Sequence, residues 1–358
     1  MYEFKPDYES AQRRIDAFWA REEAERPIVT IVYAKPDKKD YARKNHATWE
    51  EYWLDIEYRA EATEKDIGNT VYDAEAMPVA FPNMGPEIFS AWAGCPYLYS
   101  QTTTWTEPCI FDWETDADKA VVDTNHPLFK ILDNYARLLL ERGKDKFVVG
   151  LTDFHPGGDH IAALRDPERL ALDLLEHPDE VKAKLESSYA EYFGVFDYFS
   201  KMLTGSGLPV SSWTPITSRK GMYIPSNDFS CMISKQMFDE FFLEGIVREC
   251  RHYGNSIYHL DGPGALQHLD SLLSIEELDA VQWVPGAGRS EVLRWLDVYE
   301  KVIEGKKGLQ ISGVRPSDLD VLMERLPAAG VWLCMSEIGN KSESEEIMKK
   351  INKWPRKK

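Results

Sequence analysis

Two stretches of the sequence place a histidine and an aspartate two residues apart, each directly after an apolar run. His259 and Asp261 follow the run at 255–258, and Asp153 and His155 follow the run at 147–151. Side chains on a strand alternate between its faces, so each pair is predicted to project to one side. Such a pair could bind a metal ion or act as an acid and a base. It could equally be a neutral core histidine beside a helix-capping aspartate, and the residues alone leave these readings open.

Apolar, β-branched runs alternate along the chain with amphipathic helical patterns, which is typical of parallel βα units. About eight such units in 358 residues predict a closed (β/α)₈ TIM barrel that occupies residues 1–358 as a single domain. We expect an N-terminal helix within 1–25 and an irregular insertion at 85–126, where prolines and threonines argue against regular elements. The strands that must form one sheet lie around Val149, Val210, Ile257, Val281, Ile311 and Val331.

Polar and aromatic side chains follow many of these strands. In a barrel, the side chains that do chemistry lie at the carboxyl ends of the strands, so they are predicted to line one mouth. The candidates are Asn83, Asp153, His155, Trp213, Asp228, His259, Asp261, Trp283, Gln310, and Glu337 or Cys334. An open doubly wound sheet is the alternative fold. No GxGxxG or GxxxxGK[ST] motif is present, so no nucleotide cofactor is expected.

The composition excludes several classes of partner. A net charge of −18 argues against nucleic acid and anionic membranes, which require clustered Lys and Arg. No apolar run is long enough to span a membrane, and the start of the chain lacks a signal-peptide pattern, so a cytoplasmic protein is expected. The five cysteines include no CxxC pair, which fits a reducing compartment, and Cys95, Cys109, Cys231 and Cys250 are interpreted as inert packing residues.

Several motifs, taken in order, resemble the uroporphyrinogen decarboxylase superfamily. They begin at 83–86 and 152–157, continue through 163–168 and 177–179, and end with 227–230, 238–241, 258–262 and 282–288. The resemblance covers most of the chain after about residue 75 and points to an uncharacterised branch. It implies the barrel fold and two chemistries, which are tetrapyrrole decarboxylation and zinc-dependent methyl transfer from corrinoid proteins to thiols.

Departures from the two branches of the family bear on the choice between these chemistries. The decarboxylase branch has Arg-Gln-Ala-Gly-Arg after its first strand, whereas residues 33–37 here are Tyr-Ala-Lys-Pro-Asp, although Asp228 still matches the strand-end Asp of that branch. The methyltransferase branch has His-x-Cys-Gly, and here Asp261 stands at the Cys position. Its later metal-binding Cys corresponds to Glu337 or Cys334.

The resemblance therefore implies a metal set of His259 and Asp261. The third ligand is expected from Glu337, in preference to Cys334, or from the Asp153 and His155 loop. Replacing a thiolate by a carboxylate makes the set harder, so zinc or another divalent transition metal such as iron or manganese is expected. The non-metal reading keeps His259 and Asp261 as an acid and base pair, with Asp228. In both readings we expect Asp153 and His155 to contribute to catalysis.

The substrate is expected to contact Asn83, Trp213, Trp283 and Gln310 in an aromatic, mildly charged pocket. The function predicted from the sequence is a methyltransferase that acts on a small molecule, with a corrinoid protein as candidate methyl partner. A cofactor-free decarboxylase and a non-catalytic small-molecule binding protein are the alternatives. The substrate, the metal and the oligomeric state are not defined by the sequence.

Overall fold

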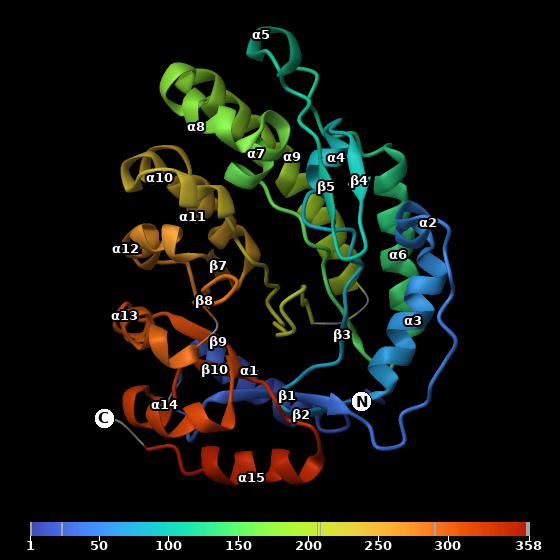
Figure 1. The fold of residues 1–358 in the computed structure, drawn as a ribbon, viewed down its shortest axis with the longest axis vertical. Coiled ribbons are helices and arrows are strands. Elements are labelled where there is room, and N and C mark those ends of the chain that lie inside the picture. Colours follow the sequence, from blue (N-terminus) through green and yellow to red (C-terminus); the bar gives the residue numbers. More distant parts are fainter. Residues whose placement is uncertain (1, 23, 206, 208, 290, 356–358) are drawn as a thin grey trace.

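The computed structural model describes residues 2–22, 24–205, 207, 209–289 and 291–355. It has a mixed α/β architecture in which parallel strands lie around one interior and helices cover their outer side (Figure 1). None of the helices in the described ranges is both long enough and apolar enough to cross a membrane.

The largest sheet has the order β2-β1-β10-β9-β8-β7, with β2 antiparallel and the other five strands parallel. These strands are β1 (Ile28–Ala34), β2 (Thr70–Ala74), β7 (Ile257–Asp261), β8 (Ala280–Val284), β9 (Gly308–Val314) and β10 (Val331–Met335). A second parallel pair joins β3 (Val79–Ala80) to β6 (Val148–Val149). The prediction of parallel βα units is therefore confirmed for the second half of the chain.

A closed eight-stranded barrel is not found among the described residues, because the two sheets do not join. Val210 forms only an antiparallel bridge with Ser218, and the segment at 223–226 is held to β7 by single parallel bridges. Leu151 still donates its N–H to Ser211 O at 2.8 Å, so the arrangement continues without a regular ladder. Prolines at 209, 215 and 225 lack the N–H that a ladder requires, which explains the interruption.

Helices follow most of the strands and pack on the outside of the sheet (Figure 1). Their bounds are α2 (Trp49–Leu54), α3 (Ile56–Gly68), α6 (Pro127–Gly143), α7 (Gly157–Arg165), α8 (Pro167–Glu176), α9 (Pro178–Gly205), α10 (Lys235–Phe241), α11 (Leu243–Tyr253), α12 (Leu269–Leu273), α13 (Leu296–Glu304), α14 (Leu319–Arg325) and α15 (Lys341–Ile351). Short 3₁₀ helices η1 (Asp228–Met232), η2 (Pro263–His268), η3 (Val292–Trp295) and η4 (Pro316–Asp318) occupy the connections.

The N-terminal helix α1 (Tyr8–Ala20) lies at the amino ends of the strands. Its buried face, including Ile15 and Phe18, packs with Ile28, Ile257 and Ala280, which begin strands β1, β7 and β8. Trp19 donates its indole N–H to Thr217 O at 2.9 Å and fixes the helix there. The predicted N-terminal helix therefore closes the end of the sheet opposite the strand carboxyl ends.

The predicted irregular insertion contains regular elements. Strands β4 (Tyr97–Tyr99) and β5 (Thr104–Thr106) form an antiparallel hairpin between α4 (Ile88–Trp92) and α5 (Trp113–Asp116). The alternating threonine and aromatic residues fit a half-buried pleated strand, and the polar turn between them closes the hairpin. The prediction that the threonine-rich part of 85–126 is irregular was wrong, because its threonine and aromatic side chains alternate as they do on a strand.

A buried ion pair ties the first two strands together. Glu75, which follows β2, receives two hydrogen bonds of 2.7 Å from the guanidinium of Arg26 and a third of 2.9 Å from Val29 N. Glu75 is 2% exposed and Arg26 is 9% exposed. Removal of the carboxylate would leave a buried cation without its counter-charge.

We expect Glu75→Ala to lower the free energy of unfolding by about 3–5 kcal/mol, the usual cost of stranding one member of a buried ion pair. Urea unfolding followed by circular dichroism measures this loss. Glu61→Ala is the matched control, because Glu61 pairs with Lys65 on an exposed helix surface, and it should unfold at nearly the wild-type urea concentration. Equal midpoints for the two variants would contradict a structural role of Glu75.

Candidate functional site

Strand β7 presents His259 and Asp261 on the interior side at its carboxyl end. Tyr258 and Leu260, which alternate with them, are 1% exposed and belong to the core on the other side of the strand. The strand parity predicted from the sequence is therefore correct. Gly262 follows with a positive φ of 76°, a conformation that glycine adopts without strain, and turns the chain away from the strand.

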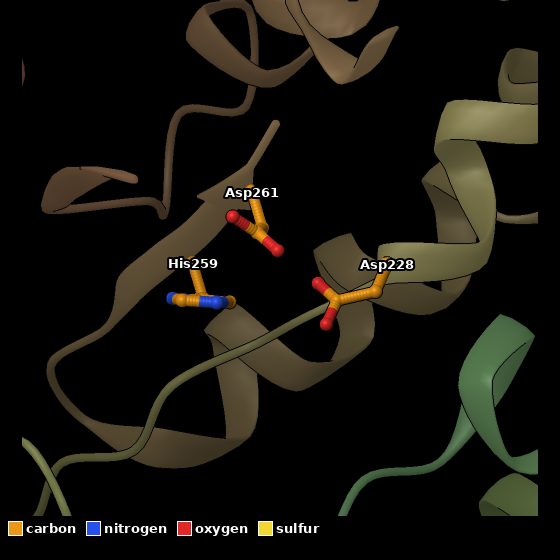
Figure 2. Close-up of side chains that lie close together, drawn as sticks. All are labelled: Asp228, His259 and Asp261. Atoms are coloured by element: carbon orange, nitrogen blue, oxygen red, sulfur yellow. The ribbon is translucent and has the colours of Figure 1, made fainter. Parts of the chain in front are cut away.

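Asp228 completes a group of three ligand-type side chains. A parallel bridge between Ser226 and His259 aligns the segment before η1 with β7, and Asp228 is the first residue of η1. One ligand atom from each of Asp228, His259 and Asp261 lies within 4.8 Å of the other two. Figure 2 shows the imidazole and both carboxylates facing one another. One buried carboxylate oxygen of Asp261, Oδ1, has no hydrogen-bond partner.

The ring of His259 is oriented by its neighbours. Its Nδ1 forms a short hydrogen bond with Gln282 Oε1, the side chain of the directly paired residue on β8. An amide oxygen only accepts, so Nδ1 carries a proton, and in the neutral ring the lone pair then lies on Nε2. Trp213 packs edge-on against the ring at 5.2 Å between centroids. An outer hydrogen bond of this kind sets the tautomer of a metal-binding histidine.

Glu337 and Cys334 take other positions from the one expected. Glu337 is an exposed residue whose carboxylate pairs with Arg315 at 3.1 Å. Cys334 accepts a hydrogen bond of 3.5 Å from Gln310 Nε2, and burial raises the pKa of its thiol. Neither belongs to the three-residue group, so the third side chain beside His259 and Asp261 is Asp228. Asp228 is the nearer side chain because the 223–226 segment that precedes it lies next to β7, whereas β10, which carries Cys334 and precedes Glu337, is three strands away from β7.

A cavity of 660 Å³ opens next to this group. Its acidic lining residues are Glu87, Asp153, Asp159, Asp166 and Asp228. Its histidines are His155, His160 and His259. Among the described residues that line it, none is Lys or Arg, and aromatic contact comes from Trp213 and Phe229. The expectation of an aromatic, mildly charged pocket was therefore wrong in charge, because Glu87, Asp159 and Asp166, which were not among the predicted residues, also line the cavity.

Asp153 and His155 lie in the cavity wall as an ion pair, with His155 Nε2 at 2.7 Å from Asp153 Oδ1. Burial disfavours the charged imidazole, but the negative charge of Asp153 and its hydrogen bond, with Asp159 behind them, outweigh burial and raise the pKa of His155 to about 9. His155 is therefore a cation at neutral pH. In this state the imidazolium offsets part of the negative charge of the neighbouring carboxylates.

Asp159 and Asp228 are linked through a single hydroxyl. Ser226 Oγ lies 3.2 Å from Asp159 Oδ2 and 3.3 Å from Asp228 Oδ1. A hydroxyl carries one proton, so it donates to one carboxylate and accepts from the other only if that group is protonated. Burial, together with the charge of Asp228, raises the pKa of Asp159. The Ser226 hydroxyl thus links Asp159 to Asp228 by donating its proton to one of the two carboxyl groups at a time.

The remaining predicted residues lie away from the cavity. Trp283 is 1% exposed and packs against Trp295 at 5.0 Å between centroids. Asn83 accepts a hydrogen bond of 2.8 Å from Gly85 N and shapes a turn. Gln310 lies beside Gln282 on the interior face, with a buried Oε1 that has no partner. None of the three belongs to the described lining of the cavity.

Sequence reasoning missed Asp159, His160, Ser226 and Gln282 as site residues. His160 is 2% exposed, lines the cavity and forms a 2.8 Å hydrogen bond between Nδ1 and Ser90 Oγ, while burial lowers its pKa to about 3. The signal for Asp159 was available, since it lies in the first turn of the helix that follows the Asp153 and His155 loop. The alternation of side chains along β8 would have placed Gln282 on the interior face, but its contact with His259 could be predicted only once the pairing of β7 with β8 was known.

The comparisons with known proteins give a structural likeness alone. No family model matches the chain, and no curated protein matches it either. Among solved structures, a methyltransferase from Methanosarcina mazei is similar with a TM-score of 0.61 and 11% sequence identity, over 96% of this chain and 98% of that chain. The likeness shows a shared fold over nearly the whole length of both proteins.

The pKa of His155 makes a signed prediction for stability. A histidine whose pKa rises on folding from 6.5 to about 9 contributes stability that is complete below pH 6.5 and lost as the pH rises through 9. We expect the free energy of unfolding to fall over this window by on the order of 1–3 kcal/mol more in the wild type than in His155→Gln. Urea unfolding at pH 6 and pH 9 measures the difference. Parallel pH profiles for the two proteins would rule out the ion pair.

The two predicted tryptophans should behave differently on truncation. Trp283→Ala removes a fully buried side chain and should destabilise the protein by about 3–5 kcal/mol. Trp213→Ala should cost clearly less, because Trp213 is half-buried and borders the cavity. Thermal and urea unfolding of both variants provides the measurement. A loss for Trp213→Ala as large as that for Trp283→Ala would place Trp213 in the core.

Proposed function

We propose that the chain is a methyltransferase of the uroporphyrinogen decarboxylase superfamily that transfers a methyl group to a small molecule in the acidic cavity. A divalent transition metal such as zinc, bound by Asp228, His259 and Asp261, is part of this proposal. The observation that carries it is the convergence of these three side chains, with Asp261 Oδ1 left without a partner and with Gln282 bound to Nδ1 of His259 rather than to Nε2. The fold shared with a methyltransferase supports the reaction class.

The three side chains of Asp228, His259 and Asp261 fit a metal site better than they fit an acid and base pair without a metal. Two carboxylates and one imidazole are compatible with zinc, iron or manganese, and three protein ligands leave a position for substrate. Two carboxylates within 4.8 Å of each other repel unless a cation or a proton lies between them. When bound, the metal would supply Lewis acidity that lowers the pKa of a coordinated acceptor heteroatom.

The surrounding residues would position the acceptor and handle its proton. In the transfer, the lone pair of the acceptor forms the new bond to the methyl carbon, and the electron pair of the broken bond stays with the donor. Gln282 keeps the His259 proton on Nδ1, away from the ligand side. The proton released by the acceptor can be taken up at Asp159, which lines the cavity and whose pKa is raised by burial and by the charge of Asp228. His155 offsets the negative charge of this network.

The lining indicates the charge of the substrate. Five carboxylates and no Lys or Arg among the described lining residues favour a neutral or cationic acceptor over an anionic one. The same observation weighs against the decarboxylase alternative, because a tetrapyrrole with many carboxylates requires basic partners. A corrinoid protein is the proposed methyl donor, in keeping with the family resemblance of the sequence.

Metal binding is the first test of this proposal. After incubation with ZnCl₂ and desalting, we expect one zinc per wild-type chain by elemental analysis and a loss of stoichiometric zinc in His259→Ala and Asp261→Ala. Glu337→Ala is the matched control, since this carboxylate is paired with Arg315, and it should retain zinc. Both site variants should keep the wild-type circular dichroism spectrum, because His259 and Asp261 are only partly buried at the end of their strand.

Activity separates the remaining alternatives. Methylcobalamin serves as methyl donor with a panel of small thiols, amines and alcohols, and demethylation is followed by absorbance. We expect His259→Ala and Asp261→Ala to lower the rate by at least about 100-fold, as removal of metal ligands does. A wild-type protein that retains no metal, or variants with the wild-type rate, would contradict the proposal. Stoichiometric zinc without transfer to any acceptor would favour a binding protein.

A further inference from the structure

Two cysteines that the sequence separates by a hairpin lie in contact. Cys95 Sγ is 3.3 Å from Cys109 Sγ, and both thiols are free. Cys95 precedes β4 and Cys109 follows β5, so the antiparallel pairing of Tyr97 with Thr106 brings them together. The hydrogen bond of 3.0 Å from Glu107 N to Pro96 O continues this pairing to the position of the thiols. The interpretation of these cysteines as inert packing residues did not anticipate this contact.

The two thiols have unequal environments. Cys95 is 5% exposed and donates its S–H to Cys109, whereas Cys109 is half-buried and lies nearer to solvent. The hydrogen bond from Cys95, followed by the charge of Lys184, lowers the pKa of the Cys109 thiol, while the pKa of Cys95 is raised by the same contact and by burial. A thiolate that is accessible and a resolving thiol beside it are the two parts of a redox-sensitive pair.

The pair also adjoins the proposed active site. Thr106, the last residue of β5, and Pro108, which directly precedes Cys109, line the cavity, as does Ala163. The Cys95 thiol also lies 3.6 Å from the carbonyl oxygen of Ala163, and Cys109 N donates to Leu164 O at 2.9 Å on helix α7. A covalent link at this point would join the base of the hairpin that forms one wall of the cavity.

We propose that Cys95 and Cys109 are a peroxide-sensitive modification site that forms a reversible intramolecular disulfide beside the cavity. The Cys109 thiolate attacks one oxygen of hydrogen peroxide, the O–O bond breaks, and the departing hydroxide takes up a proton to leave as water. Sulfur is oxidised to a sulfenic acid. The Cys95 sulfur then displaces the sulfenic hydroxyl, which leaves as a second water with the Cys95 proton, and the S–S bond forms. Two thiols are thus oxidised while one peroxide is reduced to two waters.

The remaining thiols provide an internal contrast. Cys231 is exposed, but burial and the negative charges of Asp228, Asp159 and Asp261 raise its pKa and make it a poor thiolate. Cys250 is buried and Cys334 is placed against Gln310. No other two cysteines in the described ranges are hydrogen-bonded to each other. Exposure alone therefore predicts Cys231 as the reacting residue, whereas the proposal predicts Cys109.

The test treats the full-length wild-type chain with stoichiometric hydrogen peroxide under native conditions. We expect the intact mass to fall by two hydrogen atoms and the thiols titrated after denaturation to decrease from five to three, because two are consumed. Proteolysis without reductant should yield one peptide pair cross-linked through Cys95 and Cys109, and dithiothreitol should restore all thiols.

Variants then assign the roles. Cys231→Ser, the matched control, should form the disulfide at the wild-type rate. Cys95→Ser should accumulate a sulfenic acid at Cys109 that dimedone traps, and Cys109→Ser should form no cross-link. The inference is overturned if peroxide oxidises wild-type Cys231 first, or if no Cys95–Cys109 peptide pair appears. The wild-type peptide map alone decides this if a variant does not fold, and it is independent of methyl transfer.

Discussion

The alignment of the 223–226 segment with strand β7 is the constraint on which the candidate site depends. His259 N donates to Pro225 O at 2.9 Å, and Ser226 is bridged to His259. These contacts place the start of η1, and with it Asp228, directly beside the end of the strand. A slip of one residue would turn Asp228 away and leave His259 and Asp261 as an isolated pair. Two backbone contacts between these segments therefore set the spacing of the ligand atoms of Asp228, His259 and Asp261.

The cavity beside this alignment carries a concentration of negative charge that must be offset. Several carboxylates face one interior without Lys or Arg among the described lining residues, which is costly unless protons, histidine cations or metal ions offset the charge. The structure offers two such compensations, which are the ion-paired imidazolium of His155 and the carboxyl group of Asp159, whose pKa is raised. The proposed metal would be a third. This requirement explains why a histidine lies two residues from an aspartate at two separate strand ends.

The two ends of the strands differ in polarity, with apolar packing at the amino ends and polar side chains at the carboxyl ends. Helix α1 and its aromatic residues close the amino ends with apolar packing, and the Arg26–Glu75 pair holds β1 to the residue after β2. The carboxyl ends remain free for polar groups because the hairpin β4–β5 and helix α7 form the cavity wall there. The Cys95–Cys109 contact arises from this hairpin and so belongs to the site side of the molecule.

The sequence by itself determined the local features. Alternation along β7 placed His259 and Asp261 on one face, and the βα pattern indicated the parallel strands of the second half, because periodicity depends only on neighbouring residues. The tertiary structure decided which residues meet. Asp228 rather than Glu337 lies beside the pair, Trp283 is in the core, and the parallel strands are divided between two sheets rather than closed into a barrel. Those outcomes depend on interstrand register and on missing proline N–H groups, which are contacts between segments far apart in sequence.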